Sequence, residues 1–389
     1  MILKNSINNV VKKVTASLNG ESGPEEAPSF ISIWQTDNAG TSNTDQIALP
    51  LNAAGTYNFS VKYNGSVIKT ITSYTDNIIT FPDGAGTKEI EIEGEIIGWR
   101  FNNGGDCLKL LDVSNWGPFA LGPVEDHFQG CENFNITASD APDLSFTTSL
   151  RESFERCSSL NTDNIGTWDT SAIINFSRMF LNCITFNGNV GFNTSSANSM
   201  AVMFANCQQF NQPVSTFDTS NVTSMEEMFR DCFVFNQSVS TFDTSNVTNM
   251  EEMFRKATNF NQPLPFNTSS VTSFNLMFFQ ATNFNQPLPW DTSAVTNMKD
   301  MFWQATNFNQ DLSSWDFSNV TTCNRMFLGS SFDITNYDLL LISLASQSLQ
   351  SNVPFNAGTA QYSVGTPTTA RNILTGTYLW TITDGGQAP

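Results

Sequence analysis

The sequence contains a single histidine, His127, and few basic residues. It has 17 Lys and Arg against 36 Asp and Glu, which gives a formal net charge of -19 at pH 7. Such an acidic surplus repels phosphate backbones and anionic lipid head groups, so we do not expect binding to nucleic acid or to a membrane surface. No run approaches 18 consecutive apolar residues, so the sequence predicts no transmembrane helix.

The sequence also lacks the usual motifs of catalysis and cofactor binding. Ser-His-Asp or Cys-His chemistry would depend on His127, which occupies a repeat position that Met fills further along the chain. CxxC spacing is absent, and the PDGAGTK segment at 82–88 lacks the strand-to-helix context of a phosphate loop. We therefore expect no enzymatic activity, no catalytic residue, no metal site and no cofactor.

The seven cysteines do not follow a disulfide pattern. Five of them lie three residues after a recurring Phe, and Ala takes the same position in the next repeats (Cys131, Cys157, Cys183, Cys207, Cys232, then Ala257, Ala281, Ala305). A position that accepts Cys or Ala favours a small buried side chain, so we expect a reduced packing column. A disulfide remains the alternative.

What the sequence has in abundance is phenylalanine, with 33 residues, and this Phe is periodic. From about residue 104, some nine units of 24–26 residues repeat. They align on one anchor Phe in each unit: Phe128, Phe154, Phe180, Phe204, Phe229, Phe254, Phe278, Phe302 and Phe327. A unit this short cannot bury its apolar side alone, so the repeats must stack on one another.

The unit around Phe229 illustrates the expected local structure. Met225, Met228, Phe229 and Cys232 follow the i, i+3, i+4, i+7 spacing of one helix face, and the apolar residues before the next turn suit a short strand. The sequence therefore predicts an α/β leucine-rich-repeat-type solenoid over residues 104–333, with the anchor Phe side chains in a single buried column.

Other segments flank the repeats. Residues 30–103 contain short, partly alternating β-branched runs that predict a β-sandwich, and residues 334–389 suit a C-terminal capping module. Residues 1–29 form an N-terminal segment and linker. In it, Leu3, Ile7, Val10 and Val14 make a helical seam with no core of its own, so we expect attachment or oligomerisation there.

A polar turn recurs in the repeats. It begins with Asp in five units (Asp169, Asp218, Asp243, Asp291, Asp316) and with Asn in two (Asn193, Asn267). Such side chains satisfy backbone groups at turns, which is the interpretation we favour. A calcium ladder is the alternative, although no second acidic residue recurs at ligand spacing.

The segments FNQPVSTFDTSNVTSMEEMFRDC and FNQPLPWDTSAVTNMKDMFWQA resemble the repeats of BspA-like leucine-rich-repeat surface proteins. The resemblance extends to the β-rich module before the repeats and to the closing segment NYDLLLISLASQ. It implies a solenoid displayed on a cell or particle surface, with adhesion as its role, and it supplies no catalytic residues.

The position after each anchor Phe varies from unit to unit, which makes it a candidate binding position. Arg230 and Arg255 occupy it in consecutive repeats, and Phe279 and Trp303 occupy it in the next two. Arg and aromatic side chains dominate binding hot spots. A flanking module that covers the two aromatic side chains is the alternative explanation.

We expect a non-enzymatic, adhesin-like display protein. Because the N-terminus does not have the pattern of a signal peptide, a bacteriophage virion component (decoration protein, fibre or spike) is the first hypothesis, with location on the virion surface. A bacterial cell-surface or extracellular adhesin is the alternative. The expected partners are other virion or surface proteins through residues 1–29, a host-surface protein or glycan through the solenoid, and a second copy in a homo-oligomer.

Overall fold

The computed structural model describes residues 29–389. The helical seam predicted from Leu3, Ile7, Val10 and Val14 lies outside the described residues. Six strands form one mixed sheet in the order β4-β3-β6-β1-β7-β8. These strands are β1 (Phe30–Gln35), β3 (Thr56–Tyr63), β4 (Ser66–Ile71), β6 (Thr87–Ile97), β7 (Leu110–Asn115) and β8 (Asn135–Ile136). Neighbours are antiparallel except β7 and β8, which are parallel.

Two short strands, β2 (Gln46–Ala48) and β5 (Ile78–Thr80), make a separate antiparallel pair.

The alternation of buried and half-buried residues along β1 shows which face of the large sheet is inside. Phe30 and Trp34 are fully buried, whereas Ile31 and Ile33 on the opposite face are half-buried. The Phe30 ring stacks on Phe119 with 4.4 Å between ring centroids, so the inner face continues directly into the aromatic core of the repeats.

The predicted fold class is wrong in its secondary structure. The described chain consists of strands, turns and irregular coil. Its two α-helices, α2 (Ile334–Ala345) and α3 (Thr366–Gly376), both follow the repeats, and two 3-10 turns, η1 (Cys107–Lys109) and η2 (Asn164–Thr167), come earlier. No repeat in residues 29–389 has the strand–helix pair of an α/β leucine-rich-repeat-type solenoid. The N-terminal strands form a mixed sheet instead of a β-sandwich.

The backbone around each anchor Phe explains why no helix forms there. Glu227 and Asp231, two residues before and after Phe229, have φ of 54° and 57°, and the same two positions are left-handed in the other units. Left-handed residues end an α-helix. Alternate N–H groups instead donate to the next repeat: Glu227 to Glu251 (2.9 Å), Phe229 to Met253 (3.0 Å) and Asp231 to Arg255 (2.8 Å). The spacing that predicted a helix face therefore belongs to a run of tight turns.

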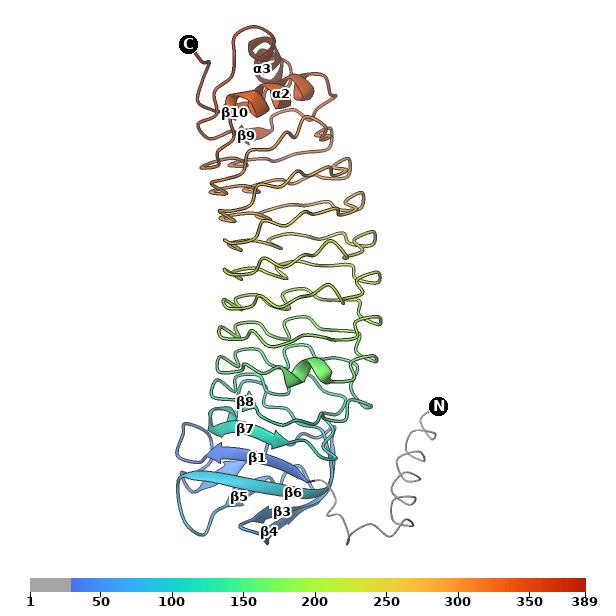
Figure 1. The fold of residues 1–389 in the computed structure, drawn as a ribbon, viewed down its shortest axis with the longest axis vertical. Helices are drawn as coiled ribbons and strands as arrows, with labels where there is room; N and C mark the ends of the chain where they lie inside the picture. Colours follow the sequence, from blue (N-terminus) through green and yellow to red (C-terminus); the bar gives the residue numbers. More distant parts are fainter. Residues whose placement is uncertain (1–28) are drawn as a thin grey trace.

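The repeats lie on one another between the sheet and the two helices, as Figure 1 shows. Single parallel bridges join successive repeats, for example Ser224 to Asn249 and Asn249 to Ser273. The anchor rings stack face to face with centroids 5.6–5.9 Å apart, and each is fully buried (Phe180, Phe204, Phe229, Phe254, Phe278, Phe302). The prediction of a single buried Phe column is confirmed.

The cysteine column is buried as predicted. All seven cysteines are buried and free, and Ala257, Ala281 and Ala305 in the same position are fully buried too. Each thiol of the column from Cys157 onward donates to the carbonyl of the anchor Phe in the preceding repeat, as in Cys207 to Phe180 (3.0 Å). Burial raises the pKa of Cys207 well above the usual range of a thiol.

Asparagine side chains form a second ladder along the repeats. The backbone N–H of Asn236 donates to the Oδ1 of Asn211 at 2.9 Å, and the same bond links Asn261 to Asn236 at 3.0 Å. At the end, the N–H of Asp333 donates to Asn309, and Asp333 then accepts from the N–H of Asn336 as the N-cap of α2. This ladder satisfies a backbone donor that a turn leaves unpaired.

The end of the chain closes the stack. Strand β9 (Pro354–Asn356) forms a parallel bridge from Phe355 to Cys323 and pairs in parallel with β10 (Thr381–Thr383). Helix α2 buries Tyr337, Leu340, Leu341 and Leu344 against this end. Strands β9 and β10 therefore continue the stacking of the repeats. Helices α2 and α3 are insertions beside these strands, and they cover the last apolar edge of the stack.

Candidate binding surface

Four positions of each repeat differ from unit to unit, while the buried columns change little. These positions lie three and two residues before the anchor Phe and one and two residues after it, and we call them the variable strip. In the repeats of Phe229 to Phe302 they are Glu226, Glu227, Arg230, Asp231; Glu251, Glu252, Arg255, Lys256; Asn275, Leu276, Phe279, Gln280; and Lys299, Asp300, Trp303, Gln304. By contrast, the Val seven residues before the anchor is kept in all four repeats and is fully buried.

The middle of the variable strip carries ion pairs. Arg230 Nε lies 3.0 Å from Glu227 Oε2, and Arg255 Nη1 lies 2.8 Å from Glu252 Oε2. Lys256 Nζ is 3.5 Å from Asp231 Oδ1 in the preceding repeat. Partial exposure limits each such pair to about 1 kcal/mol or less, so these contacts serve mainly to orient the side chains.

Beside these pairs, Glu226 faces other carboxylates. Burial raises its pKa, and the nearby charges of Glu227 and Glu251 raise it further. The Oε1 of Glu251 accepts a hydrogen bond from the Ser273 hydroxyl. This part of the strip is therefore acidic and partly desolvated.

Further along, the strip forms a continuous aromatic–arginine row. The Arg255 guanidinium lies over the Phe279 ring at 5.4 Å, and the Phe279 and Trp303 rings meet edge to face at 4.9 Å. Arg325 lies over the Trp303 ring at 4.2 Å. Cation–π contacts of this kind contribute about 0.5–2 kcal/mol each and hold the row in one arrangement.

Asp300 fixes the far end of the row. Its Oδ1 and Oδ2 each accept from the Arg325 guanidinium at 2.7 Å, from Nε and Nη2 respectively. The Asp300 side chain is only 3% exposed, and this bidentate geometry is the most directional form of the Arg–carboxylate contact. Arg325 is thereby held flat against Trp303.

The structure brings three of the four predicted binding residues together. Arg255, Phe279 and Trp303 are consecutive in the row, and the two aromatic side chains are half-buried, in contact with each other and with the arginines. Arg230 lies one repeat away, with Glu227 and Asp231, and outside the row.

Arg325 and Asp300 are not among the residues predicted from the sequence to bind. Both lie two residues before their anchor Phe, where the backbone is left-handed, with φ of 54° and 59°. Their guanidinium–carboxylate contact also joins two different repeats. The one signal in the sequence is that they occupy the same position in consecutive units.

Earlier repeats place apolar side chains on the same strip. Leu181, Val202 and Ala205 form a small cluster separate from the main core, with Ala201 packed against it. Leu181 and Val202 are each only 8% exposed. The strip thus changes from apolar to charged to aromatic along the stack, on a backbone that repeats.

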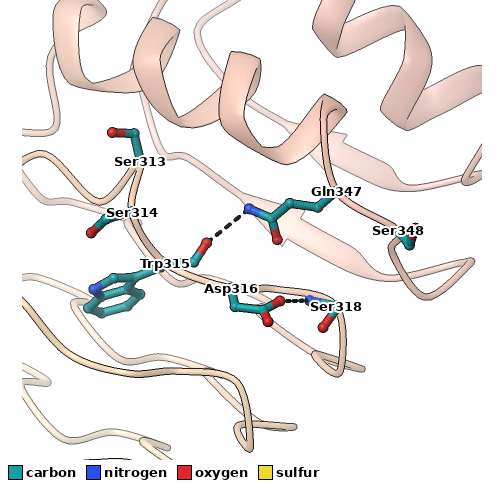
Figure 2. Close-up of a pocket in the computed structure, with 7 residues that line it drawn as sticks. All are labelled: Ser313, Ser314, Trp315, Asp316, Ser318, Gln347 and Ser348. Atoms are coloured by element: carbon teal, nitrogen blue, oxygen red, sulfur yellow. Dashed lines mark hydrogen bonds between the residues drawn. The ribbon is translucent and has the colours of Figure 1, made fainter.

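A shallow polar hollow lies where the last repeat meets α2, as Figure 2 shows. Gln347 Nε2 donates to the Trp315 carbonyl at 2.9 Å, and Gln347 Oε1 accepts from the Phe317 N–H at 2.7 Å. Asp316 accepts from the Ser318 N–H at 2.8 Å. The two Gln347 bonds join the segment after α2 to the last repeat. The Trp315 ring is 1% exposed, so the hollow leaves few unpaired groups for a ligand to contact.

His127 sits inside the protein. Its Nδ1 is 2.8 Å from the Ser153 hydroxyl, and both residues are fully buried. Burial lowers the pKa of His127 to about 3, so the imidazole is neutral at physiological pH. A Ser–His pair without access for substrate performs a packing role.

The aspartate turns are locally satisfied. Asp218 Oδ1 accepts from both the N–H and the hydroxyl of Ser220, at 3.0 and 2.7 Å, and Asn193 makes the same two contacts with Ser195. In residues 29–389, no group of three or more His, Cys, Asp or Glu side chains is placed to hold a metal ion. In the same residues, no helix has both the length and the apolar character needed to cross a bilayer.

These features define a repeat protein with a fixed core and one variable surface. The family model described as "Mycoplasma protein of unknown function, DUF285" matches the chain four times, over residues 123–236, 148–265, 223–338 and 264–362. The matches together span residues 123–362, which is more than half of the chain, and the protein belongs to this family. The BspA-like name is not part of that match. No curated protein and no solved structure matches the chain.

Proposed function

We propose that the protein is a non-enzymatic binding protein that recognises its partner through the variable strip. The observation that carries this proposal is the row formed by Arg255, Phe279, Trp303 and Arg325. It combines the two side-chain types that dominate binding hot spots, and it lies on the positions that vary between otherwise similar repeats. A scaffold that keeps its core and varies one surface suits recognition.

The row is ordered before any partner arrives, which supports the same function. Glu252 holds Arg255, and Asp300 holds Arg325, so both guanidinium groups are fixed over the rings. Side chains that are already ordered lose less conformational entropy on binding. Little of the free energy of contact with a partner is therefore lost in ordering these side chains.

The proposed setting is a surface. Repeat segments such as FNQPLPWDTSAVTNMKDMFWQA resemble those of BspA-like surface proteins, for which display and adhesion are the implied role. Within that setting we propose a bacteriophage virion component, attached through residues 1–29, and a bacterial cell-surface adhesin is the second candidate. The long stack supports either one, because the repeats of residues 255–325, which carry the aromatic–arginine row, lie far along the stack from the sheet (Figure 1).

The binding test uses fluorescently labelled full-length protein and a panel of intact bacterial cells. The double variant Phe279→Ala/Trp303→Ala is expected to weaken cell binding at least about tenfold, because it removes both rings of the row. Phe233→Ala is the matched control: this ring is 36% exposed but lies four residues after its anchor, outside the strip. Equal binding by the double variant and the wild type would contradict the proposed surface.

The location test is independent of the binding test. Mass spectrometry of purified virus particles and of washed bacterial envelopes from the native source separates the two settings. Recovery in particles supports the virion component, and recovery in envelopes supports the adhesin. Recovery only in the soluble cell fraction would contradict display.

A further inference from the structure

The outer face of the six-stranded sheet carries a row of carboxylates. Burial along strand β6 alternates except at Gly94, and Ile90, Ile92 and Ile96 are buried on the inner face. The intervening residues on the outer face are four glutamates at every second position: Glu89, Glu91, Glu93 and Glu95. Since β6 lies between β3 and β1, this row runs through the interior of the sheet and not along an edge. Like charges in line on one strand repel one another, and a cationic side chain placed beside them relieves this repulsion.

Apolar side chains lie beside the carboxylates. In the register of the sheet, Ile31 of β1 is opposite Glu91, and Ile33 is opposite Glu89. Both isoleucines are half-buried on the outer face. On the other side, Lys62 of β3 pairs with Glu93. The face is therefore acidic and partly apolar.

The N-terminal sequence has the complementary composition. Residues 1–19 contain Lys4, Lys12 and Lys13 and no Asp or Glu, so they carry three positive charges in a chain whose net charge is -19. The same residues contain the apolar positions Leu3, Ile7, Val10 and Val14. A basic, apolar segment and an acidic, apolar face suit each other in both respects.

The connection allows the two to meet within one chain. The described part begins at Ser29, whose hydroxyl donates to Glu91 in the carboxylate row itself. Nine residues, GESGPEEAP (20–28), separate this position from residues 1–19, and a Gly-containing chain of nine residues spans roughly 17 Å on average when it is a random coil. A segment tethered at the site has a millimolar effective concentration there, which favours docking within the chain over capture by another copy.

We propose that residues 1–19 dock on the outer face of the six-stranded sheet of their own chain. The lysines lie against the glutamate row, and the apolar positions pack on Ile31 and Ile33. This gives the segment a binding place on the protein, and any partner that recruits the protein through residues 1–29 competes with it. The inference does not depend on the variable strip, so either proposal can fail without the other.

The test is zero-length carbodiimide cross-linking of the full-length protein, followed by mass spectrometry. We expect amide links from Lys4, Lys12 or Lys13 to Glu89 or Glu95, and their yield should fall several-fold in 1 M salt, where the screening length is about 3 Å. Links from these lysines to carboxylates of the repeats, or no links at all, would overturn the proposal.

An equal mixture of unlabelled and ¹⁵N-labelled protein distinguishes one chain from two. Docking within the chain predicts cross-linked peptide pairs that are wholly light or wholly heavy. Mixed pairs would show that a second copy is the occupant, which contradicts the proposal as stated.

Two variants complete the test. Glu89→Gln/Glu95→Gln removes two exposed charges of the row, and we expect it to release residues 1–19 to trypsin at least several-fold faster than in the wild type. Glu132→Gln/Asp143→Asn removes two exposed charges outside the sheet and should leave the cleavage rate unchanged. Equal rates for all three proteins would refute docking on this face, and circular dichroism confirms that each is folded.

Discussion

Phe254 illustrates how a single side chain serves several repeats. Its ring stacks on Phe229 at 5.8 Å, on Phe278 at 5.9 Å and on Phe260 of its own repeat at 4.0 Å, and it is fully buried. Such aromatic pairs contribute about 0.5–1.5 kcal/mol each beyond the burial of apolar area. Loss of the Phe254 ring therefore affects the packing of three successive repeats.

Phe254→Ala is expected to lower the free energy of unfolding by about 3–5 kcal/mol, because it removes a buried ring and leaves a cavity between stacked neighbours. Urea denaturation followed by circular dichroism measures the change. Phe233→Ala, at a 36% exposed position, should cost less than about 1 kcal/mol. Similar losses for the two variants would mean that Phe254 does not support its neighbours.

The turn that begins with Asp or Asn is the element in which charge affects stability. The side-chain and backbone hydrogen bonds from Ser293 hold the pKa of Asp291 below its usual range, and Ser220 does the same for Asp218. A carboxyl with a lowered folded-state pKa stabilises the protein above its unfolded pKa of about 3.9, and this stability is lost as the pH falls through the folded pKa. Acid should therefore weaken these turns.

Asp291→Asn tests this, since Asn267 already makes the corresponding contacts with Ser269 in the preceding unit. We expect nearly wild-type stability at pH 7 and, between about pH 5 and pH 2, a smaller loss of stability than in the wild type. Urea denaturation across this pH range gives the comparison. Asp291→Ala, which removes the acceptor, should destabilise at every pH, and identical pH profiles for wild type and Asn variant would rule out the carboxylate as the source.

At the level of elements, the sequence predicted which side chains are buried but not the backbone that buries them. The spacing of Met225, Met228 and Phe229 fits a helix face, and all three are buried. The same spacing also fits successive tight turns, and only the left-handed backbone at Glu227 and Asp231 distinguishes the two. Glu rarely adopts that backbone, so Glu227 gives no sign of it, and only the position of Asp231, which holds Gly130 and Asn182 in other units, shows a residue preference for it. The side-chain period alone could not exclude the turns.

Only part of the candidate site could be predicted from the sequence. The position after the anchor is recognisable from the sequence because it varies, which identified Phe279 and Trp303. Arg325 reaches Trp303 across a repeat boundary, and nothing local in the sequence predicts that contact.

In the whole molecule, both ends of the repeat stack are closed by hydrogen-bonded structure. Strand β7 pairs with β1 of the sheet and with β8, and parallel bridges from Ile97 to Ala120 and from Ala120 to Asp143 continue into the repeats. At the other end, β9 and β10 carry the stacking on beside α2 and α3. Open edges invite association, and here the sheet and the helices occupy them.

Because this closure uses only described residues, the fold should not need the N-terminal segment. A chain that starts at Pro28 is expected to remain folded and soluble, with a melting temperature within a few degrees of the full-length protein, yet to fail to join its particle or oligomer. Differential scanning calorimetry and size-exclusion chromatography with the assembly measure the two properties. Normal assembly of the shortened chain would place attachment elsewhere, with the sheet as the next candidate.

The asparagine ladder has an evolutionary consequence. Each repeat offers the next one the same acceptor, an Asn Oδ1, and receives the same donor, a backbone N–H. One repeat can therefore follow any other and make the same contacts. Neighbouring units such as FNQPVSTFDTSNVTSMEEMF and FNQSVSTFDTSNVTNMEEMF are nearly identical, as expected after duplication. Recombination between such copies would lengthen or shorten the protein by whole rungs of about 5 Å while leaving both ends intact. The distance between the sheet and the helices can thus change by one repeat at a time through recombination.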